Sequence, residues 1–390
     1  MRSRRAHLEW GSQVDPARPP SRRRRPGPTR LIAATLLATA VGLVPAATPA
    51  TPAALAAPES ATPPNPPEVI AGGGPTTGEF AGDPDAAITR RQPAPPSASG
   101  AVSAAEQQQV TEYWTAERRD RAFGSHSAAR QDAVGTASPL STPSGDDPGS
   151  GPAAAPPPPP PPPSDGTPYT SGGLVTATTG RLFSSIGGSD FACSASVVTS
   201  RGRDLVVTAG HCLHGGAGSG FATNVAFVPD YANGATPLGI WTARHLTVTP
   251  GWAGGSNFDV DTGFALMNTQ HGRHIQDVVG AQGIAFDLPV SYQQYSFGYP
   301  RLRPFDGSTL IYCAGPGAAD SYGGPSIGVS CRMTAGSSGG PLIAGLGRLG
   351  PGHGWIDGVI SYAYSGSTDR LFGTRFGDTV RLLYYQSSGL

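Results

Sequence analysis

Proline and glycine are distributed unevenly along this chain of 390 residues, and that distribution limits which parts of it can fold. Residues 57–168 consist mainly of Ala, Pro, Gly, Ser and Thr, with an unbroken proline run at 156–163. Such a composition buries too little apolar surface to offset the backbone entropy lost on folding. We therefore expect a disordered pro-region or linker at 57–168, with the proline run as a stiff polyproline spacer.

One stretch, 104–123 (AAEQQQVTEYWTAERRDRAF), departs from that composition. Val110, Tyr113, Trp114 and Ala122 are able to form one apolar stripe on a helix. The stretch is either a pro-segment that docks on the folded part of the chain or a marginal helix in a disordered leader. We favour the first interpretation, in which the segment belongs to a pro-region that is cleaved.

Residues 1–56 have the layout of a secretory signal with a long basic flank. An arginine-rich flank is followed by an apolar stretch at 31–44 and by small residues with A-x-A spacing. The apolar stretch is shorter than the roughly 20 residues that span a bilayer. We therefore expect a cleaved signal, a secreted, extracellular protein and no stable membrane association. An uncleaved anchor, which would leave a tethered protein with a proline-rich stalk, is the alternative.

From 169 to 390 the sequence changes to short β-branched and apolar runs separated by Gly, Ser, Asn and Pro. Repeated short strands with turn signals between them predict an all-β sandwich or barrel. One helical pattern stands at the end, at 379–386, where Asp378 is a suitable N-cap residue. The length of this region suits a pair of small barrels closed by a C-terminal helix.

The charged residues exclude several chemistries. The formal net charge is zero, so no basic field attracts nucleic acid or an anionic membrane. All 27 basic residues are arginine, which excludes a Ser–Lys dyad, a Schiff-base lysine and a P-loop lysine. No nucleotide, zinc or EF-hand motif is present. We expect no cofactor, no metal and no nucleic-acid partner.

Ser338 is a candidate nucleophile because it lies in a glycine-rich segment, AGSSGGP at 335–341. A serine hydroxyl needs a neighbouring base, and the developing oxyanion needs backbone N–H donors. The glycines allow the tight bend that brings such donors to the substrate, and we expect them to be Gly336 and Ser338. The letters also fit the G-x-S-x-G elbow of α/β-hydrolases, but a strand-like run at 341–344 follows here instead of a helix.

His211 is a candidate base because an apolar strand, LVVT at 205–208, ends in Ala-Gly and presents it. Cys212 follows at once, and Cys193 lies in the preceding strand-like run. The chain has four cysteines, and an even number in an exported protein predicts disulfides. A Cys193–Cys212 bridge would hold the loop that carries the histidine.

Together, TAGHC at 208–212 and GSSGGP at 336–341 resemble the chymotrypsin/trypsin family of serine peptidases, its secreted bacterial branch most closely. The resemblance covers about 169–390, which we take as the peptidase domain. It implies two six-stranded antiparallel barrels with a C-terminal helix. It also implies that His211 is the base and Ser338 the nucleophile of an acyl-enzyme mechanism.

The family also places an aspartate between the histidine and the serine, at the start of a buried strand. Asp261 fits because a small residue and an apolar run follow it, in DTGFALM at 261–267. Asp259 is the alternative. The chain order of histidine, aspartate and serine matches this family and differs from the order in subtilisins and α/β-hydrolases. Cys313 and Cys331 are expected to pair and to brace the loop ahead of the nucleophile.

The substrate-binding residues are predicted from the same resemblance. Ser361, Tyr362 and Ala363 resemble the edge that pairs with the substrate backbone, with Tyr362 as a wall of the pocket. Arg332 stands where a trypsin-type pocket carries aspartate, so cleavage after Arg or Lys is not expected. A cationic pocket favours acidic residues, but Ile360 stands where glutamyl endopeptidases carry histidine.

Ser337 also departs from the family. Animal-type members carry there the aspartate that receives the N-terminal ammonium after activation, so we expect no such switch in this chain. Any activation would rest on loss of the leader. The sequence thus predicts a secreted, monomeric serine endopeptidase that acts on proteins or peptides. The alternative is a catalytically silent relative that serves as a binding protein.

Overall fold

The computed structural model describes residues 68–72, 93–124, 161–364 and 367–390, all of which belong to one compact unit, Pro63–Leu390. The predicted signal at 1–56 lies outside the described residues, as does most of the proline run. Within the described ranges, no helix is long and apolar enough to cross a membrane.

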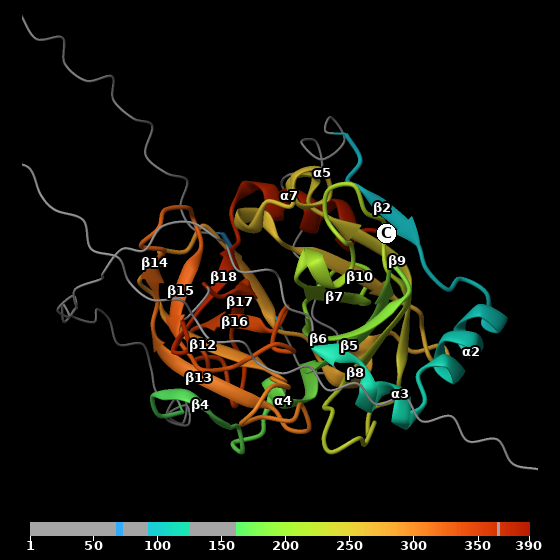
Figure 1. Ribbon diagram of the computed structural model, residues 1–390, viewed down its shortest axis with the longest axis horizontal. Helices are drawn as coiled ribbons and strands as arrows, with labels where there is room; N and C mark the ends of the chain where they lie inside the picture. The colour runs from blue at the N-terminus through green and yellow to red at the C-terminus, as the bar shows by residue number, and fades with distance from the viewer. Residues whose placement is uncertain (1–67, 73–92, 125–160, 365–366) are drawn as a thin grey trace, which may run out of the picture. The chain divides into compact units, whose positions relative to one another are not determined.

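Six antiparallel strands close a first barrel (Figure 1). Their ladders run β5–β6–β7–β10–β9–β8 and return to β5. All residues of β7 and β10 are buried, as their continuous apolar sequences require. The strands are β5 (Thr179–Ile186), β6 (Ser189–Val197), β7 (Leu205–Thr208), β8 (Thr223–Pro229), β9 (Trp241–Val248) and β10 (Gly263–Met267).

A second sheet runs in the order β14–β15–β18–β17–β16–β12–β13–β4 and curls into a half-barrel. No ladder joins β13 to β15 within the described residues, but the Cys313–Cys331 disulfide links β13 to the residue after β15. Its strands are β4 (Ser164–Pro168), β11 (Gly283–Phe286), β12 (Gln293–Gly298), β13 (Ile311–Pro316), β14 (Ala318–Ala319), β15 (Ile327–Ser330), β16 (Pro341–Ala344), β17 (Trp355–Tyr362) and β18 (Arg370–Arg375). The predicted all-β fold is confirmed, with the second barrel open.

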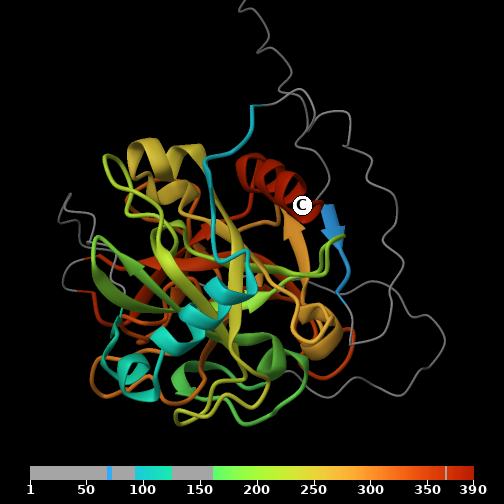
Figure 2. The ribbon, with the colours of Figure 1, turned by 90° about the vertical axis from the view of Figure 1, so that its right-hand side faces the viewer.

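The predicted C-terminal helix is confirmed as α7 (Asp378–Ser388), the red helix of Figure 2. The prediction of Asp378 as N-cap is wrong, because Gly377 is the N-cap and Asp378 lies in the first turn, 2.7 Å from Arg381. The other helices of this region are short: α4 (Leu174–Thr178), α5 (Pro250–Gly255), α6 (Ile275–Val279), and the 3-10 turns η1 (Gly210–Cys212) and η2 (Phe258–Val260).

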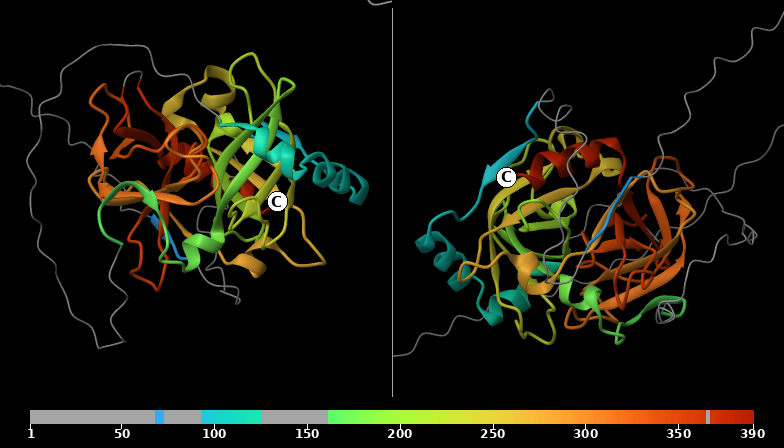
Figure 3. Two further views of the ribbon diagram at one scale, coloured as in Figure 1. Left: turned by 60° about the horizontal axis from the view of Figure 1, so that its bottom comes forward. Right: turned by 180° about the vertical axis from the view of Figure 1, so that it is seen from behind.

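Part of the leader is folded, which corrects the expectation of disorder throughout 57–168. Residues 93–124 contain β2 (Ser97–Ser99), α2 (Ala104–Tyr113), α3 (Ala116–Arg121) and β3 (Phe123–Gly124). The predicted helix is two helices, because Thr115 caps a second one through its side chain. β4 also precedes the expected domain start at 169, yet pairs with β13. Seen from behind in Figure 3, β1 (Glu68–Ile70, blue) runs along β11 of the second sheet.

Candidate active site

His211 lies in η1, directly after the buried strand β7. Its ring Nδ1 is 2.7 Å from Oδ2 of Asp261, and its backbone N–H donates to Oδ1 of the same carboxylate at 2.8 Å. A carboxylate only accepts hydrogen bonds, so this contact places a proton on Nδ1. In the described part of the chain, Nε2 has no hydrogen-bond partner. The ring is therefore held with Nε2 available to accept a proton.

Asp261 is fully buried at the start of β10. Besides His211, its Oδ2 accepts a hydrogen bond from Oγ of Ser361 at 2.6 Å. Several donors on one carboxylate compensate the cost of burying its charge. Asp259, the alternative, instead lies against the loop at Gly324, where an added Cβ would come within 2.8 Å of its Oδ1. The structure thus brings Asp261 to His211.

Ser338 lies in the loop that leads into β16, and that loop is tied to both sheets. The carbonyl of Ser338 accepts from the backbone N–H of Ser194 on β6 at 2.8 Å. The backbones of Gly339 and Gly340 exchange hydrogen bonds with Ile360 on β17, at 2.7 and 2.8 Å. Ser338 is thereby fixed between β6, whose Cys193 is bonded to Cys212 beside His211, and β17, which carries Ser361.

The N–H groups expected to bind an oxyanion belong to peptides whose directions are fixed. The carbonyl of Ala335 accepts from Arg301 N–H at 2.7 Å, and that of Ser337 accepts from Gly340 N–H at 2.9 Å. In a trans peptide the N–H points opposite to the C=O, so the N–H groups of Gly336 and Ser338 point away from these partners. Gly336 has φ +100°, and a Cβ there would lie 2.6 Å from a backbone oxygen, so only glycine fits.

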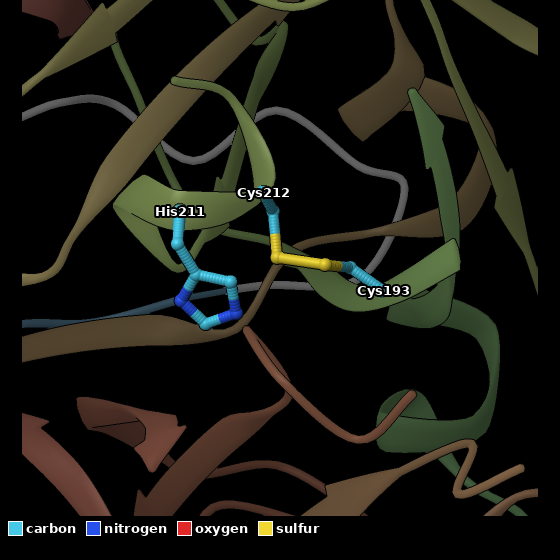
Figure 4. A group of neighbouring side chains, drawn as sticks. All are labelled: Cys193, His211 and Cys212. Atoms are coloured by element: carbon cyan, nitrogen blue, oxygen red, sulfur yellow. A yellow bond between two sulfur atoms is a disulfide. The ribbon is translucent and has the colours of Figure 1, made fainter. Parts of the chain in front are cut away.

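Both predicted disulfides, Cys193–Cys212 and Cys313–Cys331, are present. Figure 4 shows the first one beside the His211 ring, with Cys212 as the next residue of the same turn. The two sulfur atoms and one ring nitrogen of His211 lie within 4.8 Å of one another. Thiolates bind metals, whereas these sulfurs are bonded to each other. The group therefore holds the η1 turn in place and does not have the character of a metal site.

A cavity of about 470 Å³ opens beside Ser338 and is large enough for a substrate side chain. The structure brings the four predicted substrate-binding residues, Arg332, Ser361, Tyr362 and Ala363, together along its wall. Two further arginines that the sequence reasoning missed, at 303 and 370, also line it, and none of the described lining residues is Asp or Glu. The described wall of the cavity is thus cationic.

Arg332 lines the cavity and also forms a salt bridge with Asp165. Its guanidinium forms two contacts of 3.0 Å with the carboxylate of Asp165 on β4, and both side chains are more than half exposed. Asp165 precedes the predicted domain and was not expected near the site, because no local pattern links the two positions. Gly166, its neighbour, lines the cavity itself.

Tyr362 is positioned by a buried acid that sequence reasoning also missed. Its hydroxyl donates to Oδ2 of Asp320 at 2.8 Å, and the hydroxyl of Tyr364 donates to the same oxygen at 2.6 Å. The ring stacks on Phe372 with centroids 5.3 Å apart. Burial raises the pKa of the Tyr362 hydroxyl well above its ordinary value, so it stays a neutral donor. The Tyr362 part of the cavity wall is therefore held in place from both its hydroxyl and its ring.

Comparison with solved structures shows that the fold is similar to that of known proteases. Neither a family model nor a curated protein matches the sequence. Among solved structures, the protease Anisep from Arthrobacter nicotinovorans is 38% identical, with a TM-score of 0.52, over 55% of this chain and 96% of that chain. The thermostable serine protease AL20 from an extremophilic microorganism is 36% identical, with a TM-score of 0.53, over 56% of this chain and 99% of its own.

Both matches extend over nearly the whole length of the other protein, so the similarity concerns a complete domain. The two-sheet architecture of the described residues and the resemblance of TAGHC and GSSGGP lead to the same family. The chain belongs to the chymotrypsin/trypsin-like serine peptidases.

Proposed function

We infer that the protein is a secreted serine endopeptidase whose catalytic residues are His211, Asp261 and Ser338. The observation that carries this proposal is the buried Asp261 carboxylate, which is hydrogen-bonded to both His211 and Ser361 beside a cavity lined by Ser338. The two disulfides support export to an oxidising compartment. That the enzyme is a monomer and binds no nucleic acid stays a prediction.

The proposed reaction has two halves, acylation of Ser338 and hydrolysis of the acyl-enzyme, and His211 moves protons in both. Oγ of Ser338 attacks the peptide carbonyl while Nε2 of His211 takes its proton, and Asp261 stabilises the imidazolium. The N–H groups of Gly336 and Ser338 bind the oxyanion. Collapse breaks the C–N bond, and the imidazolium gives its proton to the leaving amine. Water then attacks the acyl-enzyme with His211 as base, which releases the acid and restores the Ser338 hydroxyl.

A fluorophosphonate probe tests this function in the folded, full-length chain. We expect one equivalent of label on Ser338, no label after denaturation, and neither label nor hydrolysis with Ser338→Ala. Ser337→Ala is the matched control, since its hydroxyl donates within the loop, to the carbonyl of Thr334 at 2.8 Å, and it should still be labelled. A folded wild type that takes no label would favour the catalytically silent binding protein.

The cationic cavity predicts discrimination against basic substrates. A cation about 4 Å from one guanidinium in water meets roughly 1 kcal/mol of repulsion, and Arg303 and Arg370 both line the cavity. Arg332 lines it as well, but its charge is balanced in part by Asp165. Tenfold corresponds to about 1.4 kcal/mol. We expect kcat/KM for Arg or Lys before the scissile bond to be at least about tenfold below that for Leu or Glu in matched peptides. A preference for Arg in a peptide library would contradict this.

A further inference from the structure

Residues 93–124, the docked segment, lie across the outside of the first barrel, as the cyan ribbon of Figure 2 shows. β2 pairs with β9 at 245–247, whereas β8 covers β9 only at 241–242. The N–H groups of Gly100 and Ala101 continue this ladder by donating to β9 carbonyls at 2.9 Å. The docked segment thus provides the hydrogen-bond partners for the part of β9 that does not pair with β8.

Trp114 anchors the docked segment in the core. Its side chain has no exposed surface, and its ring centroid is 5.3 Å from that of Phe183 on β5. Its Nε1 donates to the carbonyl of Asn224. Near the exposed face of the barrel, Arg118 and Tyr113 bind the carboxylate of Asp190 at 2.6 and 2.7 Å. A buried Trp contributes some 150–250 Å² of contact, so this is a built interface.

A series of packed aromatic rings extends from Trp114 to Tyr299, which contacts the loop that carries Ser338. Phe183 packs on Tyr231 with centroids 6.2 Å apart, and Tyr231 packs on Tyr299 at 5.9 Å. The guanidinium of Arg181, which is 2% exposed, lies 4.9 Å from the rings of both Phe183 and Tyr231. All four aromatic rings belong to one core cluster. Close-packed cores transmit displacement, so we expect a change at Trp114 to shift Tyr299.

Tyr299 and Arg301 in turn hold the loop that leads into β16 and carries Gly336 and Ser338, here called the oxyanion loop. The N–H of Tyr299 donates to Oγ of Ser194 at 2.9 Å, and that hydroxyl donates to the carbonyl of Gly336 at 2.9 Å. Arg301 N–H donates to the carbonyl of Ala335, and this bond sets the direction of the Gly336 N–H. The geometry of the proposed oxyanion site therefore depends on the segment from Tyr299 to Arg301.

A second path reaches the same segment by hydrogen bonds. The guanidinium of Arg301 donates to the carbonyl of Arg119 on α3 at 3.4 Å. Arg119 is 7% exposed and donates to the carbonyls of Trp114 and Gly234 at 2.6 and 3.3 Å. Its side chain thereby fixes the C-terminal half of the docked segment next to Arg301.

We propose that the docked segment is retained in the working enzyme, and that Trp114 and Arg119 are positioning residues for the oxyanion loop. Family members of the animal type use a buried ammonium on an aspartate for this purpose, and Ser337 stands at that position here. The contacts of the docked segment replace that support from outside the barrel. Any processing at 125–160 would leave residues 93–124 bound. The inference rests on the proposed peptidase function.

Mass spectrometry of the secreted, active wild type tests retention. Native spectra should give a mass that includes residues 93–124, either in one chain or as a bound peptide that separates only on denaturation. A mature enzyme that lacks these residues and keeps the kcat of the form containing them would overturn the proposal.

Point variants of the full-length chain test positioning. We expect Trp114→Ala to lower kcat by roughly ten- to a hundredfold with little change in KM, because oxyanion stabilisation acts in the transition state. Trp114→Phe should restore most of the rate. Gln108→Ala is the matched control on the exposed face of α2, where its side chain donates a hydrogen bond to Glu112 of the same helix, and should match the wild type. Arg119→Gln should lower kcat in the same way. If Trp114→Ala does not fold, Arg119→Gln is the variant that tests positioning.

The outcomes separate this proposal from the proposed function. Normal kcat in folded Trp114→Ala and Arg119→Gln, with wild type labelled at Ser338, would overturn the positioning role alone. A loss of thermal stability with unchanged kcat would do the same, since it would show a merely structural role. Absence of wild-type labelling would overturn the peptidase function and this inference with it.

Discussion

Replacing Asp261 with asparagine should lower kcat by about 10⁴-fold and leave KM and the fold nearly unchanged. The carboxylate accepts from Nδ1 of His211, from the backbone N–H of His211 and from Ser361. An amide has one accepting oxygen, so its NH2 must face one of these donors. With the NH2 toward Nδ1, the histidine proton moves to Nε2, and the ring can no longer accept the proton of Ser338.

Asp259→Asn is the matched control for this prediction, since it makes the same chemical change two residues away. Its kcat should stay within about threefold of the wild type, because the carboxylate that contacts His211 is that of Asp261, whereas Asp259 lies against Gly324. The measurement is kcat and KM on one peptide substrate for both variants at several pH values. The reverse result, a large loss with Asp259→Asn and a small one with Asp261→Asn, would reassign the acid.

The second large effect concerns stability rather than catalysis. Asp357 on β17 is 2% exposed, its Oδ2 accepts from Nε2 of Gln294 at 2.7 Å, and its Oδ1 has no partner within the described ranges. Burial raises the pKa of this carboxyl to about 7. Asp357 is thus a buried acid that keeps its proton in the folded state well above the pH at which the unfolded chain loses it.

The sign of the pH dependence follows from proton counting. Between about pH 4 and 7 the folded state binds the proton of Asp357 and the unfolded state does not, so the free energy of unfolding falls as pH rises. The contribution is fully present below the ordinary pKa and is lost above about 7. At 1.36 kcal/mol per pKa unit, the loss is on the order of a few kcal/mol.

Asp357→Asn should therefore raise the free energy of unfolding by roughly 2–4 kcal/mol at pH 8 and change it little at pH 4. The amide stays neutral, and its oxygen can still accept from Gln294. Urea unfolding in a Ser338→Ala background, which prevents self-digestion, measures this. Asp378→Asn, at a side chain 88% exposed, is the control and should show no such pH-dependent gain. An equal effect at both pH values would contradict the assignment.

The parts of the site that could be predicted from sequence are those with a local signature. His211 and Ser338 lie in short strings that combine a strand end or a glycine-rich bend with the reactive side chain, and Asp261 precedes a buried strand. The all-β class follows from short apolar runs separated by turn residues, which are properties of neighbouring positions. Each of these depends on few residues that are close in the chain.

The features of the site that the sequence did not predict depend on contacts between residues far apart in the chain. Asp320 and Tyr362, and Asp165 and Arg332, meet only through the pairing of strands far apart in sequence. Residues 104–123 were predicted to dock as a helical pro-segment, whereas the composition of the rest of 57–168 predicted disorder, because composition counts the apolar surface of a segment alone. Trp114 finds its apolar partners on β5, and that surface is invisible to a composition argument.

The strand β4 makes the position of any cleavage in the leader important for the cavity. Asp165 forms a salt bridge with Arg332 and Gly166 forms part of the cavity wall, although both precede the domain start predicted at 169. Trimming a few residues from this end removes a negative charge from the rim and leaves Arg332 unbalanced. Two mature forms that differ only in where the leader is cut would thus differ in electrostatic preference, and the processing step would itself select which substrates are cleaved.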